Sequence, residues 1–383
     1  MSSQPLDGVT VVDLTHVLAG PYASMTLSDL GARVIKVERP GIGDDTRAFA
    51  PFVDGESAYF ATINRGKESI ALDLKAEEDR AIFERMLARA DVVLENFRPG
   101  VMEKLGYGWE DLHARWPHLI YGAVSGYGHT GPWSGKPAYD MVVQAEGGVM
   151  SITGEAGREP VRCGASIGDI TAGMFLAQGV MAALYDRMRT GDGRKIDIAM
   201  LDSQLAIIEH AVAITNATGA PPGPTGARHP SIAPFETYHA DDGLIVIAAG
   251  NDALFAKACE ALGLEGVAED PKFATNIDRV ANVRALKRRF EMALLYDTVD
   301  NWIEKLEAAG VPTGRIQTVD EVMAHPQIAA RNMVASLAPD AGGRRFTAAG
   351  DPIKMTGRDD PAERPAAPAL DGDRAAILAW LEG

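Results

Sequence analysis

Short apolar segments rich in β-branched residues alternate with helical patterns along the first half of the chain. The segments predicted as strands are 8–14, 32–38, 69–75, 91–97, 118–128 and 194–200. Between them, the spacing of apolar residues predicts helices over 19–31, 76–90 and 169–189, and another helix that begins at Leu201. This alternation predicts an α/β fold with a parallel sheet and helices on its faces.

The second half of the chain has a different pattern. Residues 216–231 are rich in Gly and Pro and predict a linker. A hairpin over 235–250 and helices near 251–263, 281–294 and 298–310 predict a second unit, and a last helix is expected at 373–383. The length of 383 residues also exceeds what one typical core supports, so at least two domains are expected.

Charge and composition narrow the function classes. The net charge of −16 argues against non-specific binding to nucleic acid, although it leaves room for a local basic pocket. The first residues lack the regions of a signal peptide, and no apolar run reaches the ~18 residues of a membrane span. Cys163 and Cys259 are far apart and form no metal-binding pattern. We expect a cytoplasmic protein without a metal ion, a membrane span or a nucleic-acid partner.

A solitary acid, Asp169, stands among small and apolar residues in the segment CGASIGDITAGMF. Because Asp is a preferred N-cap residue and a helical pattern follows, a structural cap is the simplest interpretation of this position. Gly168 and Ala165 before it, and Gly173 one turn later, would also leave room for a bulky ligand.

Cationic residues recur where predicted strands end, at Arg39, Lys75 and Arg98, and Lys104 and Lys136 follow in loops. Parallel sheets bind ligands at the carboxyl ends of their strands, so these cations could serve a polyanionic ligand; most such side chains are simply solvated. The first strand–helix turn has Gly20 but no GxGxxG, which disfavours a nicotinamide site.

Taken together, these segments resemble the class III (CaiB/BaiF-type) CoA-transferase family. The matching segments are 11–47, 64–75, 91–100, 125–133, 139–150 and 168–175, with a looser match at 243–255 and 310–328. The resemblance implies a large Rossmann-like CoA-binding domain, 1–215, completed by 330–383. It also implies a smaller α+β domain that, with its linker, spans 216–329, and two ring-shaped chains interlocked as a homodimer.

The resemblance also implies the acting residues. Asp169 matches the family nucleophile, which forms a mixed anhydride and then an aspartyl-CoA thioester. We expect this carboxylate to be ionised at pH 7, helped by the helix N-terminus. The coenzyme A of the acyl-CoA substrate is expected near Val17, Leu18, Ala19, Arg39, Leu72, Lys75, Asn96, Phe97, Arg98, Lys104 and Lys136.

The free carboxylic acid is expected near a second group of residues. Tyr139 and Asp140 match residues that line the family's active site. Arg47 and Arg228 lie in matching motifs, GDDTR and ARHPSIAPF, and are candidates for binding the second carboxylate of a dicarboxylic acid. His229, beside Arg228, is a further substrate candidate. These motifs resemble the branch that moves CoA from succinyl-CoA to other dicarboxylates.

Three alternatives are less favoured. The 2-methylacyl-CoA racemases share the fold but have His where this chain has Tyr139, and Tyr is a poor base at pH 7. The formyl-CoA branch that acts on oxalate carries Gln and Trp where this chain has Leu18 and Ala48, which makes oxalate a doubtful acceptor. A non-catalytic CoA-binding protein would bind CoA without turnover.

Overall fold

The computed structural model describes residues 4–383, and the chain divides into two compact units. The large unit comprises the described residues up to Val149, together with Arg162–Glu209 and Met323–Gly383. The small unit comprises Met150–Val161 and His210–Val322. These boundaries lie a few residues from those expected at 215 and 329. Segment 150–161 differs more. The sequence predicted it in the large domain, but it belongs to the small unit, where Gly154 O accepts a hydrogen bond of 2.8 Å from Gly226 N.

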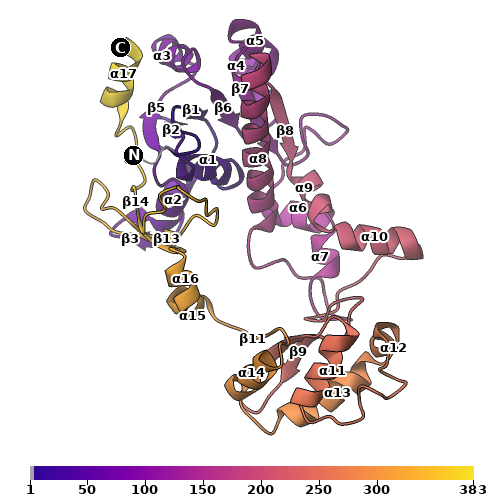
Figure 1. Ribbon diagram of the computed structural model, residues 1–383. Coiled ribbons are helices and arrows are strands. Elements are labelled where there is room, and N and C mark those ends of the chain that lie inside the picture. Colours follow the sequence, from indigo (N-terminus) through magenta and orange to yellow (C-terminus); the bar gives the residue numbers. More distant parts are fainter. Residues whose placement is uncertain (1–3) are drawn as a thin grey trace. The chain divides into compact units, whose positions relative to one another are not determined.

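A six-stranded parallel sheet forms the centre of the large unit (Figure 1). In spatial order its strands are β5 (Glu68–Ala71), β2 (Arg33–Glu38), β1 (Thr10–Asp13), β6 (Val92–Glu95), β7 (Ile120–Ser125) and β8 (Lys195–Ala199). Counted along the chain, this is the order 3-2-1-4-5-6 of dinucleotide-binding folds, so the predicted α/β fold is confirmed. The strand order reverses between β1 and β6, where Val12 faces Ile35 on one side and Val93 on the other.

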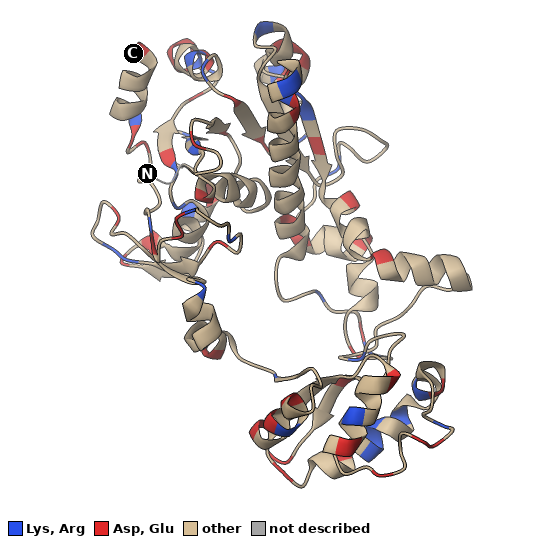
Figure 2. Cartoon of the chain, viewed as in Figure 1, with Lys and Arg blue, Asp and Glu red and all other residues tan. Residues whose placement is uncertain are grey.

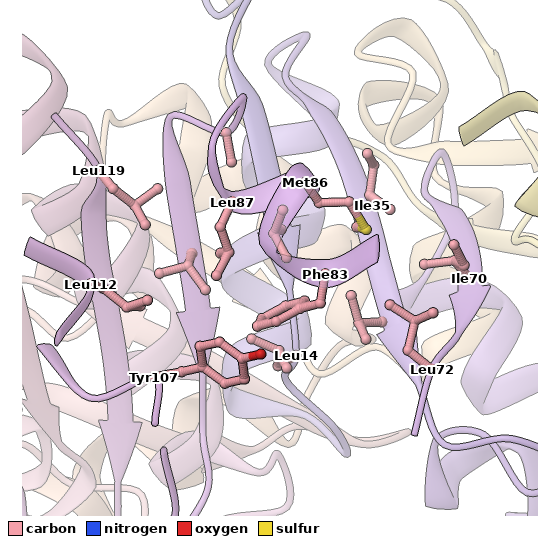
Figure 3. Close-up of a cluster of buried hydrophobic side chains, with 14 of the residues drawn as sticks. Leu14, Ile35, Ile70, Leu72, Phe83, Met86, Leu87, Tyr107, Leu112 and Leu119 are labelled. Atoms are coloured by element: carbon pink, nitrogen blue, oxygen red, sulfur yellow. The ribbon is translucent and has the colours of Figure 1, made fainter. Parts of the chain in front are cut away.

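Alternate residues of the strands enter two separate cores, one on each face of the sheet. Val11 belongs to the core beneath α1 (Ala19–Asp29) and α8 (Ile167–Thr190). Val12 belongs to the opposite core, where α3 (Glu77–Leu87) and α17 (Arg374–Glu382) pack. Figure 3 shows this second core, with Phe83 of α3 at its centre.

Helix α8 carries the segment that contains Asp169 and lies against α1. A Cβ at Gly173 would come within 2.5 Å of Ala19 O, so the two helices approach this closely only because position 173 has no side chain. The helix is long and apolar enough to cross a membrane by length and composition, but 44% of its most apolar window is buried inside the protein. Its composition therefore fits a core helix. Between Asp169 in its first turn and Asp186 near its end the helix has no charged residue, and Figure 2 shows this stretch in tan.

The end of the chain returns to the large unit. Asp373 Oδ2 accepts a hydrogen bond of 2.9 Å from Ser69 N, and Asp371 Oδ1 accepts one of 2.7 Å from Ala71 N, along the free edge of β5. A small sheet of β13 (Thr347–Ala349), β12 (Val334–Leu337) and β14 (Glu363–Arg364) precedes this return. Other short elements of the large unit are η1 (Asp45–Ala48), β3 (Phe52–Val53), β4 (Glu56–Ser57), α2 (Ala58–Ile63), α4 (Val101–Leu105), α5 (Trp109–Arg115), α6 (Asp140–Glu146), α9 (Met200–Ile207) and α16 (Pro326–Ala330).

The small unit has a core of its own. The predicted hairpin is present as β9 (Phe235–His239) and β10 (Leu244–Ala248), which with β11 (Thr313–Arg315) form an antiparallel sheet in the order β11-β10-β9. Its helices are α11 (Asp252–Ala261), α12 (Asn276–Ala281), α13 (Val283–Leu294) and α14 (Val299–Ala308). Three further helices lie at or near the boundaries of the units: α7 (Val149–Ile152), α10 (Glu209–Thr218) and α15 (Val319–Ala324).

Candidate active site

A cavity of about 390 Å³ opens at the point where the strand order of the sheet reverses. All its lining residues belong to the large unit. They come from the loop after β1 and the start of α1, from η1, from the loop after β6 and the start of α4, from the end of β7 and the segment that leads into α6, and from the starts of α8 and α9. The residues that line the cavity are His16, Val17, Leu18, Ala19, Asp45, Asn96, Phe97, Arg98, Pro99, Val101, Val124, Ser125, Gly126, Lys136, Pro137, Ala138, Tyr139, Asp169 and Met200.

The loop after β1 is held in a tight conformation. Val17 has a φ of 65°, which a β-branched residue rarely adopts, and Asp44 Oδ1 accepts a hydrogen bond of 3.2 Å from its backbone N–H. The side-chain amide of Asn96 accepts a bond of 2.9 Å from His16 N and donates one of 2.7 Å to His16 O. Asn96 therefore joins the loops after β1 and β6 with both ends of its amide.

Two buried charged residues stabilise the loop after β1. Lys36 is 1% exposed; its Nζ donates to Thr15 O at 2.7 Å and lies 2.8 Å from Asp44 Oδ2. Burial raises the pKa of Asp44, but Lys36 and the hydrogen bonds from Thr46 outweigh that effect and lower it to about 2. Because both charges are buried and paired, removing one partner would leave the other uncompensated.

The structure gathers most of the predicted CoA-binding residues at the cavity, but not all of them. Val17, Leu18, Ala19, Asn96, Phe97, Arg98 and Lys136 line it. Arg39, Lys75 and Lys104 are exposed and do not, although Arg39 pairs with Asp45, which does. Leu72 is 3% exposed and packs in the core, so its side chain is not available to a ligand there.

Asp169 is the third residue of α8, not its N-cap. The helix begins at Ile167, and the residue at the N-cap position is Ser166, whose side chain makes no capping hydrogen bond. The N-cap interpretation of Asp169 is therefore wrong, and its carboxylate lines the cavity instead.

Asp140 occupies the position at the N-terminus of α8 that an anion would take. It is the first residue of α6, and its Oδ1 accepts a hydrogen bond of 2.8 Å from Gly168 N. Its Oδ2 accepts one of 2.7 Å from Gln144 Nε2. A Cβ at Gly168 would come within 2.7 Å of Val143 Cγ2 and 2.9 Å of Asp140 Oδ1, so this approach requires glycine. Gly168 N–H is consequently not free to bind a reacting oxygen.

Burial and the charge of Asp140 raise the pKa of Asp169 to about 7. An ordinary, fully ionised carboxylate was expected, and that expectation is wrong for two reasons. Desolvation disfavours the charged form, and the neighbouring carboxylate repels it. The N–H group of Gly168, in the first turn of α8, does not offset these effects, because Asp140 already accepts its hydrogen bond.

Two tyrosines lie near this carboxyl pair. Tyr139 lines the cavity and is 75% exposed. Tyr59 of α2 was not identified from the sequence. Burial, followed by the charges of Asp169, Asp44 and Asp140, raises the pKa of Tyr59 to about 12, so its hydroxyl stays protonated. Nothing in the pattern around position 59 predicts a helix or a site, so only the three-dimensional fold reveals it.

Arg47 lies at a different cavity from Asp169. Its Nε and Nη2 donate to the two carboxylate oxygens of Glu38 at 2.8 and 2.7 Å, and its guanidinium lies 3.7 Å from the centre of the Phe60 ring. It lines a separate cavity of about 250 Å³ that also includes Glu56 and Arg344. Glu38 occupies the Nε/Nη2 edge of the guanidinium and Nη1 lies 3.7 Å from Glu56 Oε1, so the charge of Arg47 is already paired within the protein.

Arg228 and His229 belong to the small unit. Within residues 4–383 Arg228 forms no ion pair; its Nη1 donates to His229 O at 2.9 Å. The His229 ring stacks on that of His210 with 5.5 Å between centroids. Burial, then the charges of His210 and Arg228, lower the pKa of His229.

Known proteins show the same fold and sequence pattern. The pattern of CoA-transferase family III matches residues 6–374. The chain belongs to CoA-transferase family III. The acetyl-CoA:oxalate CoA-transferase of Acetobacter aceti is 48% identical over 97% of this chain and 95% of its own. The succinate–glutarate CoA-transferase of Agrobacterium fabrum is 39% identical over 99% of this chain and 96% of its own. The crystal structure of a CaiB/BaiF family protein from Brucella suis is 41% identical, with a TM-score of 0.86 over 99% of both chains.

This class III CoA-transferase thus uses an acyl-CoA and a carboxylic acid as substrates. The racemase alternative is not supported, because both named relatives are transferases. The predicted family is confirmed, and so is the α/β fold that it implies for the chain.

Proposed function

We propose that Asp169 is the nucleophile that carries the acyl group and then CoA. The observation that supports this role most is the position of its carboxyl group in the cavity at the strand reversal, beside the loops that end β1 and β6. The Asp169 carboxylate attacks the thioester carbonyl of the acyl-CoA. The carbon–sulfur bond breaks, which gives a mixed anhydride and CoA thiolate.

The second half of the reaction regenerates a thioester. The thiolate attacks the Asp169 carbonyl of the anhydride, and the donor acid leaves as its carboxylate. The aspartyl-CoA thioester that remains conserves the energy of the original thioester. The acceptor carboxylate then attacks this thioester, and the same two steps run in reverse to release the new acyl-CoA and free Asp169.

We also propose that the acceptor is a dicarboxylic acid. Both named relatives act on dicarboxylates, oxalate in one case and glutarate in the other. Succinyl-CoA remains the proposed donor, with four- to six-carbon dicarboxylates as acceptors. Transfer from acetyl-CoA to oxalate is the second candidate, because the relative with that name shares 48% of its sequence with this chain. That similarity opposes the argument from Leu18 and Ala48 against oxalate.

Arg228 is the proposed partner of the second carboxylate. Two arginines are candidates, and Arg228 is favoured because Glu38 occupies Arg47 whereas Arg228 pairs with no carboxylate of the described residues. A free guanidinium can bind a carboxylate through two parallel hydrogen bonds.

A homodimer is the proposed assembly. Helix α10 has no buried residue although it includes Val212, and Met188 of α8 is 85% exposed. Apolar surface of this kind on two helices is typical of an interface between protein chains.

The direct test is a mass-spectrometric assay of CoA exchange. Succinyl-CoA and acetyl-CoA are each incubated with oxalate, succinate, glutarate and butyrate, with isotope-labelled acid where donor and acceptor coincide. The proposal predicts new acyl-CoA from glutarate at a far higher kcat/KM than from butyrate. Binding of CoA without exchange would contradict the transferase proposal, and equal rates for butyrate and glutarate would contradict dicarboxylate selection.

A further inference from the structure

Gln144 is a buried amide that contacts the active-site carboxyl pair without lining the cavity. It is fully buried, and it follows Asp140 by one turn of α6. Its Nε2 donates to Asp140 Oδ2 at 2.7 Å, and its Oε1 accepts a hydrogen bond of 2.9 Å from Cys163 N. Both ends of the amide are therefore used, each in the role that its chemistry permits.

Together with the bond from Gly168 N to Asp140, these two bonds link α6 to α8 and to the segment that leads into it. Asp140 belongs to α6, and its other oxygen accepts Gly168 N in the first turn of α8. Cys163 lies in the segment that leads into α8, three residues before the N-cap, Ser166. Gln144 therefore links α6 to the segment before α8, while Asp140 links α6 to α8 itself. Rotation of the Asp140 carboxylate would break two hydrogen bonds at once.

We propose that Gln144 is a positioning residue for the nucleophile: by fixing the Asp140 carboxylate on Gly168 N, it sets where the charge next to Asp169 lies. This inference rests on the proposed role of Asp169. A displaced carboxylate would alter the electrostatic repulsion on Asp169, and a loosened segment before α8 would move its first turn.

The chemistry of the position distinguishes glutamine from its near-isosteres. In Gln144→Glu, the bond from Cys163 N keeps an acceptor, but a second carboxylate faces Asp140 in a buried position, where like charges repel strongly. In Gln144→Met, the shape is nearly kept and both hydrogen bonds are lost. Comparing the two variants therefore separates the effect of an added charge from the effect of losing both hydrogen bonds.

Among the described residues, few titratable or charged groups lie near Asp169. Asp140 of α6 raises its pKa directly, and Tyr59 of α2 is affected by its charge. The other titratable groups that line the same cavity are His16, Asp45, Arg98, Lys136 and Tyr139. None of these five hydrogen-bonds to Gln144, so we expect a change in pH dependence caused by Gln144 to act through Asp140.

The experiment measures kcat and KM for CoA exchange from pH 5.5 to 9 in wild type, Gln144→Glu and Gln144→Met. The matched control is Gln317→Glu, which adds the same charge at an exposed position. In Gln144→Glu we expect the acid limb of kcat/KM to move to higher pH by about one unit, with a kcat about fivefold lower at pH 7 that recovers toward wild type at pH 9. In Gln144→Met we expect a lower kcat at every pH. KM for the acyl-CoA should change less than about twofold in both, because Gln144 does not line the cavity.

A readout independent of activity tests the anchor itself. The thiol of half-buried Cys163 should react several-fold faster with an alkylating reagent in Gln144→Met, whereas buried Cys259 should not change. Thermal unfolding tests whether each variant is folded. If Gln144→Met does not fold, the pH profile of Gln144→Glu tests the inference alone. If Gln144→Glu does not fold, the kcat and the Cys163 reactivity of Gln144→Met test it.

Wild-type pH profiles and wild-type kcat in the folded variants would overturn the inference. So would a loss of activity that lies in KM alone. Asp169→Asn is assayed in parallel. If it retains turnover, the proposed function fails; if it is inactive while the Gln144 variants behave as wild type, only the role of Gln144 fails.

Discussion

Replacing Asp169 by Asn should stabilise the folded protein at alkaline pH while abolishing turnover. The wild-type carboxyl group is half-buried beside Asp140, and its pKa is raised from 3.8 to about 7. The folded state therefore keeps a proton on Asp169 over a pH range in which the unfolded chain has lost it. The charged form opposes folding, and the amide of Asn imitates the protonated acid.

The size of the effect follows from that shift. A change of about three pKa units corresponds to about 4 kcal/mol between the two protonation states. Because part of the carboxyl group remains in contact with water, solvent screening reduces this to about 1–3 kcal/mol. The stability of wild type should fall as pH rises from about 4 to 7, and the difference from Asp169→Asn should be complete above pH 7 and absent near pH 4.

The assay is thermal or urea unfolding of both proteins at pH 4.5 and pH 8. The matched control is Glu304→Gln, which removes one exposed negative charge and so reports the general effect of a lower net charge. At pH 8 we expect Asp169→Asn to melt several degrees above wild type, and above any increase in the control. Equal stability at pH 8, or the same gain at both pH values, would refute the electrostatic argument.

Three other predictions concern the carboxyl pair, the two candidate arginines and the assembly. Asp140→Asn should move the acid limb of kcat/KM to lower pH, because the charge that raises the pKa of Asp169 is lost; an unchanged limb would exclude that coupling. Arg228→Met should lower kcat/KM for glutarate by an amount equivalent to about 2–5 kcal/mol, with little effect on butyrate. Arg47→Met should mainly lower the melting temperature, because it leaves Glu38 unpaired. Equal losses for all acids in both variants would contradict this separation. Sedimentation should show a dimer down to nanomolar concentration, because the expected interface exceeds the usual ~1,600 Å²; a folded monomer at that concentration would disprove it.

The parallel sheet could be predicted from the sequence because its strands carry their own signal. Segments such as 8–14 and 91–97 are short, apolar and β-branched, and the structure places β1 and β6 within them. The short helix α2 and the strands β12 to β14 carry no such periodicity, since they are stabilised by the large unit around them. Helix α10 has no buried residue, so no amphipathic pattern marks it.

The sequence could identify residues that line the cavity themselves. It could not identify the residues that influence Asp169 through a neighbouring group. Asp169, Arg98 and Lys136 could be named from motifs, and all three line the cavity. The raised pKa of Asp169 could not be predicted, because it depends on Asp140, 29 positions earlier in the chain, being bound to Gly168 N. Gln144 offered one signal, its spacing of one helical turn after Asp140, but its bond to Cys163 required the fold.

Trapping of the covalent intermediate on Asp169 tests the central claim most directly. The enzyme is incubated with its acyl-CoA donor, treated with hydroxylamine or borohydride, digested, and mapped by mass spectrometry. The account predicts modification of Asp169 alone, dependent on acyl-CoA rather than free CoA, and absent from Asp169→Asn. An unmodified Asp169 in an enzyme that turns over, or the same adduct on Cys163 or another residue instead, would contradict the proposed mechanism.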